Sequence, residues 1–245
     1  MKVNMIKENI RIEDEKAQDN YLFFSSLELI DYFFNNLTEQ DIKTQTKRIF
    51  EMARVFMRRR DFELDDIYSI LVMVRDINYR SVVNEVFRLY FREEKFPIRV
   101  FVQISEIEST ADIEMEFSAF RGGKTFINLV KGHPYGPFSQ GVVIEDYVHC
   151  SGVLPLAVSP REGNFKQDVR QCLETLKKVL ESVGTGLDKA YSFIVYLPNL
   201  ELLPEMEEVF TEYFTEEDDI LQEVTKVEKL IENHKIEISC SAHLK

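Results

Sequence analysis

The sequence contains few residues of the types that build disulfide or metal frameworks. Cys150, Cys172 and Cys240 are odd in number and widely spaced, which favours neither a disulfide framework nor a zinc motif. We therefore expect reduced thiols, most of them buried. The histidines also lack metal-ligand spacing, so we expect no metal site and read them as structural or surface residues: His133, His149, His234 and His243.

Long apolar runs and excess positive charge are absent as well. No apolar run approaches the length of a membrane-spanning helix. The start, MKVNMIKENIRIEDEK, has no apolar stretch after its basic residues, which argues against a signal peptide and predicts a cytoplasmic protein with no membrane partner. The formal net charge of -13 repels phosphate backbones, so we expect no nucleic-acid partner. The basic cluster Arg58-Arg59-Arg60 lies where a predicted helix ends, and there it complements the helix dipole.

The chain contains an internal repeat. The segment LDDIYSILVMVRDINYRSVVNEVFRLYF (64–91) matches LDKAYSFIVYLPNLELLPEMEEVFTEYF (187–214) at ten of 28 positions, at an offset of 123 residues without a gap. The same offset places Ile113-Glu114 on Ile236-Glu237. A duplicated domain follows, and the length and 44% hydrophobic content allow a core in each copy. We expect copy one at 1–122, a linker rich in Gly and Pro at 123–135, and copy two at 136–245.

Hydrophobic periodicity predicts the same elements in both copies. In copy one we expect a strand pair at 9–13 and 21–27, followed by a loop and a helix at 39–58 that Thr38 caps. A strand buried on both faces follows at 67–74, then a helix at 81–91 that Ser81 caps. Two strands at 98–104 and 111–120 complete the copy. In copy two, the strands 142–144 and 147–153 precede a helix at 165–182, which Gly184 can end. Pro204 suits the first turn of the last helix. The predicted fold class is α+β, with two tandem ββαβαββ domains, each a mixed sheet with two helices on one face.

Both faces of the central strand are apolar in each copy. In copy two, Tyr191, Phe193, Val195 and Leu197 alternate with Ile194 and Tyr196, although two helices cover only one face of a sheet. An uncovered apolar face of this size is an interaction surface. We therefore expect self-association, as a homotrimer of about 86 kDa, three times the 28.8 kDa chain.

Four short motifs resemble the RidA/YjgF family of imine deaminases. GPFSQG (136–141) and CSGVLP (150–155) in copy two are similar to that family's GPYSQ and SGQxP segments. FPIRV (96–100) and IEME (113–116) in copy one are similar to its FPARS and IEIEA segments. The resemblance implies cofactor-free hydrolysis of reactive enamines and imines, of the 2-aminoacrylate type, to 2-oxo acids and ammonia. It also implies trimeric rings with sites between subunits, and thus an enzyme like a 2-iminobutanoate or 2-iminopropanoate deaminase.

The resemblance also assigns site residues. Arg99 would grip a substrate carboxylate, Glu114 would position a water, and both are the expected catalytic residues. The other expected substrate-binding residues are Asn84, Ser25, Ser26, Phe138, Ser151, Gly152 and Glu237. Copy two has Gln222 where copy one has Arg99, so we expect the working site in copy one.

The residues themselves support a pairing of Arg99 with Glu114. Strand alternation turns Arg99, Phe101 and Gln103 to one side, and Glu114 and Glu116 away from their apolar neighbours, so that the guanidinium and carboxylate can share one sheet face. An Arg fork binds a planar carboxylate bidentately, and a nearby Glu can activate water. A salt bridge that only fixes assembly would need the same residues.

Three functions stay open at this point. The first is a RidA-like deaminase. The second is a degenerate member that binds a small carboxylate or acts as a scaffold, which the change to Gln222 and Ser26 favours. The third is a chorismatase-like hydrolase, because that group also resembles two YjgF-type units in one chain.

Overall fold

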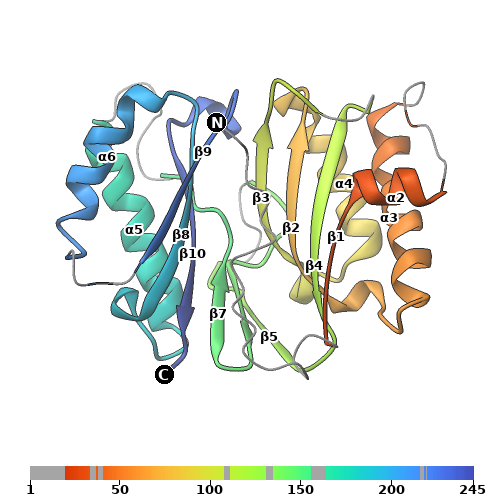
Figure 1. The fold of residues 1–245 in the computed structure, drawn as a ribbon, viewed down its shortest axis with the longest axis horizontal. Coiled ribbons are helices and arrows are strands. Elements are labelled where there is room, and N and C mark those ends of the chain that lie inside the picture. Colours follow the sequence, from red (N-terminus) through yellow and green to blue (C-terminus); the bar gives the residue numbers. More distant parts are fainter. Residues whose placement is uncertain are drawn as a thin grey trace.

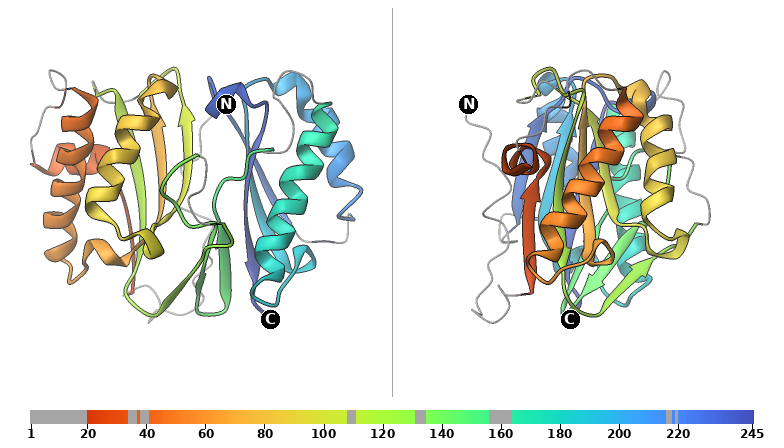
Figure 2. Two further views of the ribbon diagram at one scale, coloured as in Figure 1. Left: turned by 180° about the vertical axis from the view of Figure 1, so that it is seen from behind. Right: turned by 90° about the vertical axis from the view of Figure 1, so that its right-hand side faces the viewer.

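The computed structural model describes residues 20–33, 37, 41–107, 111–130, 135–155, 164–215, 218 and 220–245. Two β-sheets stand side by side in the middle of the molecule, and the helices cover their outer sides (Figure 1). The view from behind shows the same order of layers (Figure 2). Each sheet therefore has one face against its own helices and one face turned toward the centre.

The first sheet belongs to copy one and has the strand order β1-β4-β2-β3. Its strands are β1 (Tyr21–Ser25), β2 (Ile67–Val74), β3 (Ile98–Gln103) and β4 (Ile113–Phe120), and its helices are α2 (Ser26–Phe33), α3 (Ile42–Arg58) and α4 (Arg80–Tyr90). On the helix side, Ile70, Val72 and Val74 of β2 are fully buried. On the other side, Leu71 and Met73 are partly buried and pack against the core, so the second face of β2 is less completely buried than predicted.

The second sheet has the order β5-β6-β7-β10-β8-β9. Its elements are β5 (Lys124–Ile127), β6 (Gly141–Ile144), β7 (Tyr147–Cys150), α5 (Phe165–Glu181), β8 (Ala190–Leu197), α6 (Leu203–Phe210), β9 (Leu221–Lys226) and β10 (Glu237–His243). From β6 to β10 the order is the predicted ββαβαββ. Gly184 has a φ of 85° just after α5, as expected of a glycine that ends a helix, and Pro204 lies in the first turn of α6.

The two copies share one strand register. In copy one, Ile70 is opposite Arg99 on β3, and Met73 is opposite Glu114 on β4. In copy two, Phe193 is opposite Gln222, and Tyr196 is opposite Glu237. Each copy-two residue is the copy-one residue shifted by 123, so the gapless repeat in the sequence is also a structural repeat.

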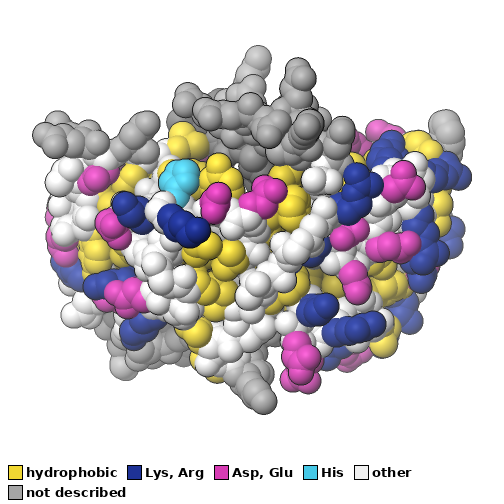
Figure 3. All heavy atoms as spheres, turned by 90° about the horizontal axis from the view of Figure 1, so that it is seen from below, with side chains coloured by type: hydrophobic (Ala, Val, Ile, Leu, Met, Phe, Trp, Pro, Cys, Tyr) yellow, Lys and Arg dark blue, Asp and Glu magenta, His cyan; other side chains and the backbone are white. Residues whose placement is uncertain are grey.

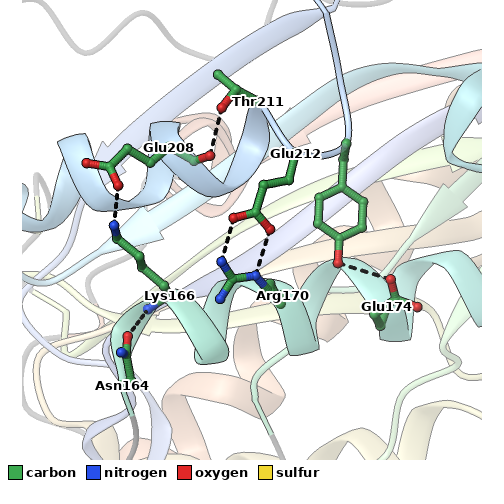
Figure 4. Close-up of polar contacts among 8 residues, drawn as sticks. Asn164, Lys166, Arg170, Glu174, Glu208, Thr211 and Glu212 are labelled. Atoms are coloured by element: carbon green, nitrogen blue, oxygen red, sulfur yellow. Dashed lines mark hydrogen bonds and ion pairs between the residues drawn. The ribbon is translucent and has the colours of Figure 1, made fainter.

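Surface contacts between the paired helices repeat at the same offset. Lys43 pairs with Glu85 between α3 and α4, and Lys166 pairs with Glu208 between α5 and α6 (Figure 4). The Tyr90 hydroxyl donates to Glu51 at 2.8 Å, and the Tyr213 hydroxyl donates to Glu174 at 3.0 Å. Exposed pairs contribute little stability, so these contacts show common descent of the copies more than they hold the helices together.

Several local predictions were wrong. The segment after β1 is helix α2, not a loop, and β5 lies inside the expected linker and pairs with β6. Asp41 caps α3, because its carboxylate accepts from the Thr44 N–H at 3.0 Å; Thr38 and the expected strand 9–13 lie outside the described residues. Ser81 does not cap α4, which follows a single 3₁₀ turn (Ile77–Tyr79) without a side-chain cap.

The two sheets pack against each other at the outer edge of β3, which no other strand of the first sheet covers. The core of copy one extends across this junction and includes copy-two residues: Tyr135, Leu154, Tyr196, Val227, Leu230 and Ile231. Seen from below, hydrophobic side chains lie along the middle of the molecule, and charged ones lie on both flanks (Figure 3). None of the helices in the described part is long and apolar enough to cross a membrane.

Candidate functional site

The edge of β3 positions the site. The Arg99 N–H donates to the Ser151 hydroxyl at 2.9 Å, and the Gly152 N–H donates to the Arg99 carbonyl at 3.1 Å. Four residues after Arg99 along the same strand, the Gln103 N–H donates to the Lys229 carbonyl at 2.9 Å. An edge strand needs partners for its outward backbone groups, and copy two supplies them. Arg99 is thereby fixed at the junction of the two copies.

The side chain of Arg99 is held in a fixed orientation. Only 4% of Arg99 is exposed. Its Nη1 donates to Asn84 Oδ1 at 2.7 Å, and its Nη2 donates to the Tyr135 carbonyl at 3.1 Å. These bonds use two of the five guanidinium N–H groups, and no other side-chain hydrogen bond of Arg99 occurs among the described residues. Within the described structure, the remaining donors are available to a planar anion.

Three aromatic rings surround the guanidinium. Its carbon lies 5.2 Å from the ring centre of Phe87, 5.6 Å from that of Phe101 and 5.3 Å from that of Phe138. Burial lowers the pKa of Arg99 to about 9, although the charge of Glu237 acts to raise it. A desolvated cation of this kind binds an anion more strongly than a hydrated one.

Glu237 of β10 is the carboxylate that shares this space. It is 3% exposed, and its Oε2 has no hydrogen-bond partner within the described structure. Burial raises the pKa of Glu237 to about 8, while Arg99 and a backbone hydrogen bond with Phe101 act to lower it. Gly152 makes room for this side chain, since a Cβ at that position would lie 1.9 Å from Glu237 Oε1.

Arg99 and Glu237 line one cavity of about 310 Å³. Residues of both copies form its walls: Arg99, Phe101, Leu129, Val130, Tyr135, Phe138, Gln140, Ser151, Gly152, Val153, Leu154, Thr175, Lys178, Val179, Ile231 and Glu237. Across the described part of the chain, Arg99 and Glu237 form no ion pair with each other. A buried cation and a buried carboxyl group thus face the cavity without neutralising each other by direct contact.

Gly136 closes the space behind the guanidinium. Its φ is 137°, in the region that favours glycine, and a Cβ there would lie 2.6 Å from both Arg99 Nη2 and Asn84 Oδ1. Glycine is therefore required at this position both for its backbone conformation and for the space that Arg99 and Asn84 occupy. The GPFSQG motif thus wraps around the arginine of the other copy.

The structure brings most of the predicted site residues together. Arg99, Phe138, Ser151, Gly152 and Glu237 line the cavity, and Asn84 holds Arg99. They come from both copies, so the expectation of a site built within copy one is corrected. The equivalent of Arg99 in copy two, Gln222, is exposed at the far edge of the second sheet.

Glu114 lies elsewhere. Arg99 and Ile70 are register partners and share the helix side of the first sheet, whereas Glu114 and Met73 share the opposite side. The expectation that Arg99 and Glu114 share a face is therefore wrong, because it rested on alternation within separate strands, without their relative register. Because the two side chains lie on opposite sides of the first sheet, the geometry within one chain does not favour a salt bridge between Arg99 and Glu114.

Ser25 and Ser26 also lie outside the cavity. Ser25 begins α2: its hydroxyl accepts from the Glu28 N–H at 3.2 Å, and Glu28 accepts from the Ser25 N–H at 2.7 Å. This is a capping box, and the S-x-x-E spacing in the sequence could have revealed it. Ser26 is fully buried, and its hydroxyl accepts from the Met115 N–H at 2.9 Å. Both serines serve the fold of copy one.

Two further residues belong to the site and were not predicted. The Tyr135 carbonyl holds Arg99, and the Tyr135 hydroxyl lies 3.0 Å from His234 Nε2 and donates to Glu232 at 3.2 Å. Gln140 lines the cavity. Both flank or belong to the GPFSQG motif, which was the available signal. Where the structure describes them, no groups of His, Cys, Asp and Glu could hold a metal ion, and the three cysteines are free and buried.

Comparison with known proteins gives consistent matches. The sequence profile of the family Endoribonuclease L-PSP matches residues 17–121 and again residues 130–244. A RutC family protein of Pyrococcus abyssi is 33% identical over 102 residues, which are 42% of this chain and 80% of that protein. The mitochondrial protein mmf1 of Schizosaccharomyces pombe is 30% identical over 122 residues, 49% of this chain and 75% of that protein.

One solved structure matches both copies at once. A chorismatase crystal structure superimposes with a TM-score of 0.70 over 91% of this chain and 75% of that chain, at 16% identity. At this identity the match shows a shared fold. The arrangement of two similar units in one chain therefore also occurs in another protein.

Proposed function

Because the chain belongs to the Endoribonuclease L-PSP family, we propose that it hydrolyses small reactive 2-imino and 2-enamino acids to 2-oxo acids and ammonia. The proposed site is the cavity between the copies. The observation that carries the proposal is that buried Arg99 of copy one and buried Glu237 of copy two line the same cavity.

Arg99 would bind the substrate carboxylate. Its free N–H groups form a fork that matches two carboxylate oxygens, and charge-assisted bonds of this kind contribute about 1.5 to 3 kcal/mol each. Asn84 and the Tyr135 carbonyl fix the fork before substrate arrives, so little conformational entropy is lost on binding. With the carboxylate on Arg99, the adjacent imine carbon is directed into the part of the cavity that Glu237 lines.

Glu237 would act as the general base and general acid. In the cationic iminium form of the substrate, the positive nitrogen favours the carboxylate form of Glu237. The carboxylate accepts a proton from water as the water oxygen bonds to the imine carbon and the C=N π electrons move to nitrogen. The proton then passes to the amine and the C–N bond breaks, while Glu237 takes up the hydroxyl proton. Glu237 then gives this proton to the released ammonia and is a carboxylate again. Iminium and water give 2-oxo acid and ammonium, with no cofactor needed for the balance.

The charge of the chain supports a small acid over a nucleic acid as ligand. A net charge of -13 opposes approach of a phosphate backbone, whereas one buried arginine suffices for a single carboxylate. The cavity is also enclosed by both copies, a form that suits a small molecule.

The test is release of pyruvate from freshly generated 2-aminoacrylate. A pyridoxal-phosphate lyase acting on serine supplies the enamine, and a coupled dehydrogenase reports pyruvate. We expect the purified protein to increase the rate above spontaneous hydrolysis. If the rate does not change but calorimetry detects binding of 2-oxo acids, the protein is a small-carboxylate-binding member; if neither occurs, the proposal is wrong.

A further inference from the structure

Two exposed hydrophobic residues stand at the mouth of the cavity. Leu129 is 48% exposed and Val130 is 52% exposed, and both belong to the cavity wall. They follow β5, in the segment that connects the two copies. Exposed single hydrophobic residues are ordinary on a protein surface, but two in sequence at a cavity mouth form apolar surface that a ligand can cover.

Gln140 holds this pair of residues in place. Its Oε1 accepts from the Leu129 N–H at 2.7 Å and from the Val130 N–H at 2.9 Å. Its own backbone N–H donates to the Ile127 carbonyl at 2.8 Å, and its carbonyl accepts from the Ser151 N–H at 3.0 Å. Since the Ser151 hydroxyl accepts from the backbone N–H of Arg99, a continuous set of hydrogen bonds connects the two hydrophobic residues to the main chain of Arg99.

Other residues of the cavity wall are apolar as well. Leu154, Val179 and Ile231 line it and are nearly or fully buried. A cavity of about 310 Å³ equals the volume of about ten water molecules at ~30 Å³ each. A three-carbon imino acid held by Arg99 would leave much of this volume, and the apolar walls, in contact with water.

We propose that Leu129 and Val130 form an apolar lip that selects 2-imino acids with a bulky hydrocarbon side chain, of the size found in leucine or phenylalanine. Gln140 is a positioning residue that holds the lip. The inference rests on the proposed function, since it places the substrate carboxylate on Arg99 and extends the side chain toward the lip.

The first experiment measures binding of stable 2-oxo acids, the product class, by calorimetry. The series is pyruvate, 4-methyl-2-oxopentanoate, phenylpyruvate and 2-oxoglutarate. We expect 4-methyl-2-oxopentanoate to bind at least about tenfold more tightly than pyruvate, because each buried methylene adds up to about fourfold in affinity. Phenylpyruvate should bind at least as tightly as 4-methyl-2-oxopentanoate, and 2-oxoglutarate should bind no more tightly than pyruvate.

The second experiment changes the lip. A protein with Leu129→Ser and Val130→Ser should lose most of the preference, so that its affinities for 4-methyl-2-oxopentanoate and pyruvate differ by no more than about threefold. The matched control is Leu200→Ser, since Leu200 is 40% exposed but lies outside the cavity; its ratio should equal that of the parent.

A third pair of variants tests the positioning role of Gln140. Gln140→Glu keeps an oxygen that accepts from the backbone N–H groups of Leu129 and Val130. It should keep the parent ratio of affinities for 4-methyl-2-oxopentanoate and pyruvate, even if the added charge weakens the binding of both. Gln140→Leu removes the acceptor and should lower the ratio toward that of the lip variant.

The outcomes separate this inference from the proposed function. If none of the 2-oxo acids binds and the pyruvate assay shows no increase in rate, the proposed function fails. If they bind with equal affinity, or if 2-oxoglutarate binds best through Lys178 at the mouth, only the lip inference is overturned.

Discussion

Strands β3 and β9 occupy the same place in the two copies but differ in their surroundings. Both are edge strands. β3 pairs in parallel with β2, β9 pairs in parallel with β8, and Arg99 and Gln222 are in equivalent register. Copy two covers the outer edge of β3, and five of its six residues are buried. In the described part of the chain β9 pairs only with β8, and none of its residues is buried.

The comparison shows how a duplicated chain divides one site between two copies. Burial of a cation is costly unless partners compensate, so an arginine at the covered edge needs Asn84, the Tyr135 carbonyl and a ligand. At the exposed edge of β9 there is no buried site for a cation, so an uncharged glutamine is sufficient at the position equivalent to Arg99. The carboxylate role shows the reverse pattern, because Glu237 lines the cavity and its equivalent Glu114 does not. Each copy therefore contributes one half of the site.

The largest expected effect separates the two glutamates. Glu237→Gln removes the proton acceptor and should lower the rate of imine hydrolysis by about 10²- to 10⁴-fold, with binding of 2-oxo acids retained. Glu114→Gln should leave the rate unchanged, because Glu114 lies on the opposite side of the first sheet from Arg99. The coupled pyruvate assay measures both. A loss in Glu114→Gln equal to that in Glu237→Gln would contradict the assignment.

The next effect separates the two edge strands. Arg99→Gln gives β3 the residue of β9 and removes at least one charge-assisted bond to the ligand, so affinity for a 2-oxo acid should fall by about 10- to 150-fold. Gln222→Ala should bind as the parent does, since Gln222 is exposed and distant from the cavity. Calorimetric titration measures both. Parent-like binding by Arg99→Gln would mean that the carboxylate lies elsewhere.

Much of this comparison was present in the sequence. The offset of 123 residues identified Gln222 as the equivalent of Arg99 and Glu237 as the equivalent of Glu114, and the strand registers agree. The helices α3 and α5 were predicted to within a few residues, because their apolar stripes have the helical period over 17 residues each.

The pairing of copies could not be predicted in the same way. Local periodicity gives the direction of a side chain relative to its own strand, but it does not say which surface covers an edge. The partners of β3, such as Ser151 and Lys229, are far away in sequence, and backbone groups make most of these contacts. Backbone contacts leave no residue pattern, so the meeting of Arg99 with Glu237 instead of Glu114 required the structure.

Gly152 and Gly123 give a third comparison. Gly152→Ala places a methyl group 1.9 Å from Glu237 Oε1, so the carboxyl group must move, and the hydrolysis rate should fall at least about tenfold, with a stability loss of about 1 to 3 kcal/mol. At Gly123 a Cβ would have no neighbour within 4 Å, and Gly123→Ala should match the parent in both respects. The pyruvate assay and urea unfolding measure rate and stability. Full activity in Gly152→Ala would show that the position of Glu237 is not critical.

The pH dependence of stability tests Glu237 without substrate. Burial raises its pKa from 4.5 to about 8, so the folded protein keeps a proton that the unfolded chain has released. This stabilisation is complete below pH 4.5 and is lost as pH rises to about 8. Burial lowers the pKa of His149 from 6.5 to about 4, which gives the opposite slope below pH 6.5. Between pH 6.5 and 8, therefore, Glu237 should lower the free energy of unfolding by at most about 1.4 kcal/mol per pH unit.

Urea unfolding at several pH values in this window measures the slope. In this window Glu237→Gln should have a flatter profile of unfolding free energy against pH than the parent. Parallel profiles for the parent and Glu237→Gln would show that Glu237 has the same proton affinity in both states.

The smallest expected change is in the mass of the assembly, which is three times the mass of one chain if the exposed edge of β9 mediates association. The edge of β9 is equivalent to the edge of β3, and the edge of β3 docks on copy two of the same chain. On the β9 edge, Leu221 is 46% exposed. We expect this edge to dock on a further chain, as a trimer of about 86 kDa from chains of 28.8 kDa. By equivalence with Arg99, the Gln222 N–H points outward, so Gln222→Pro spares the pairing with β8 but blocks docking. Light scattering should give a trimer for the parent and for Gln222→Ala, and a monomer for Gln222→Pro. A monomeric parent at micromolar concentration would contradict the trimer, and a trimeric Gln222→Pro would place its interface away from β9.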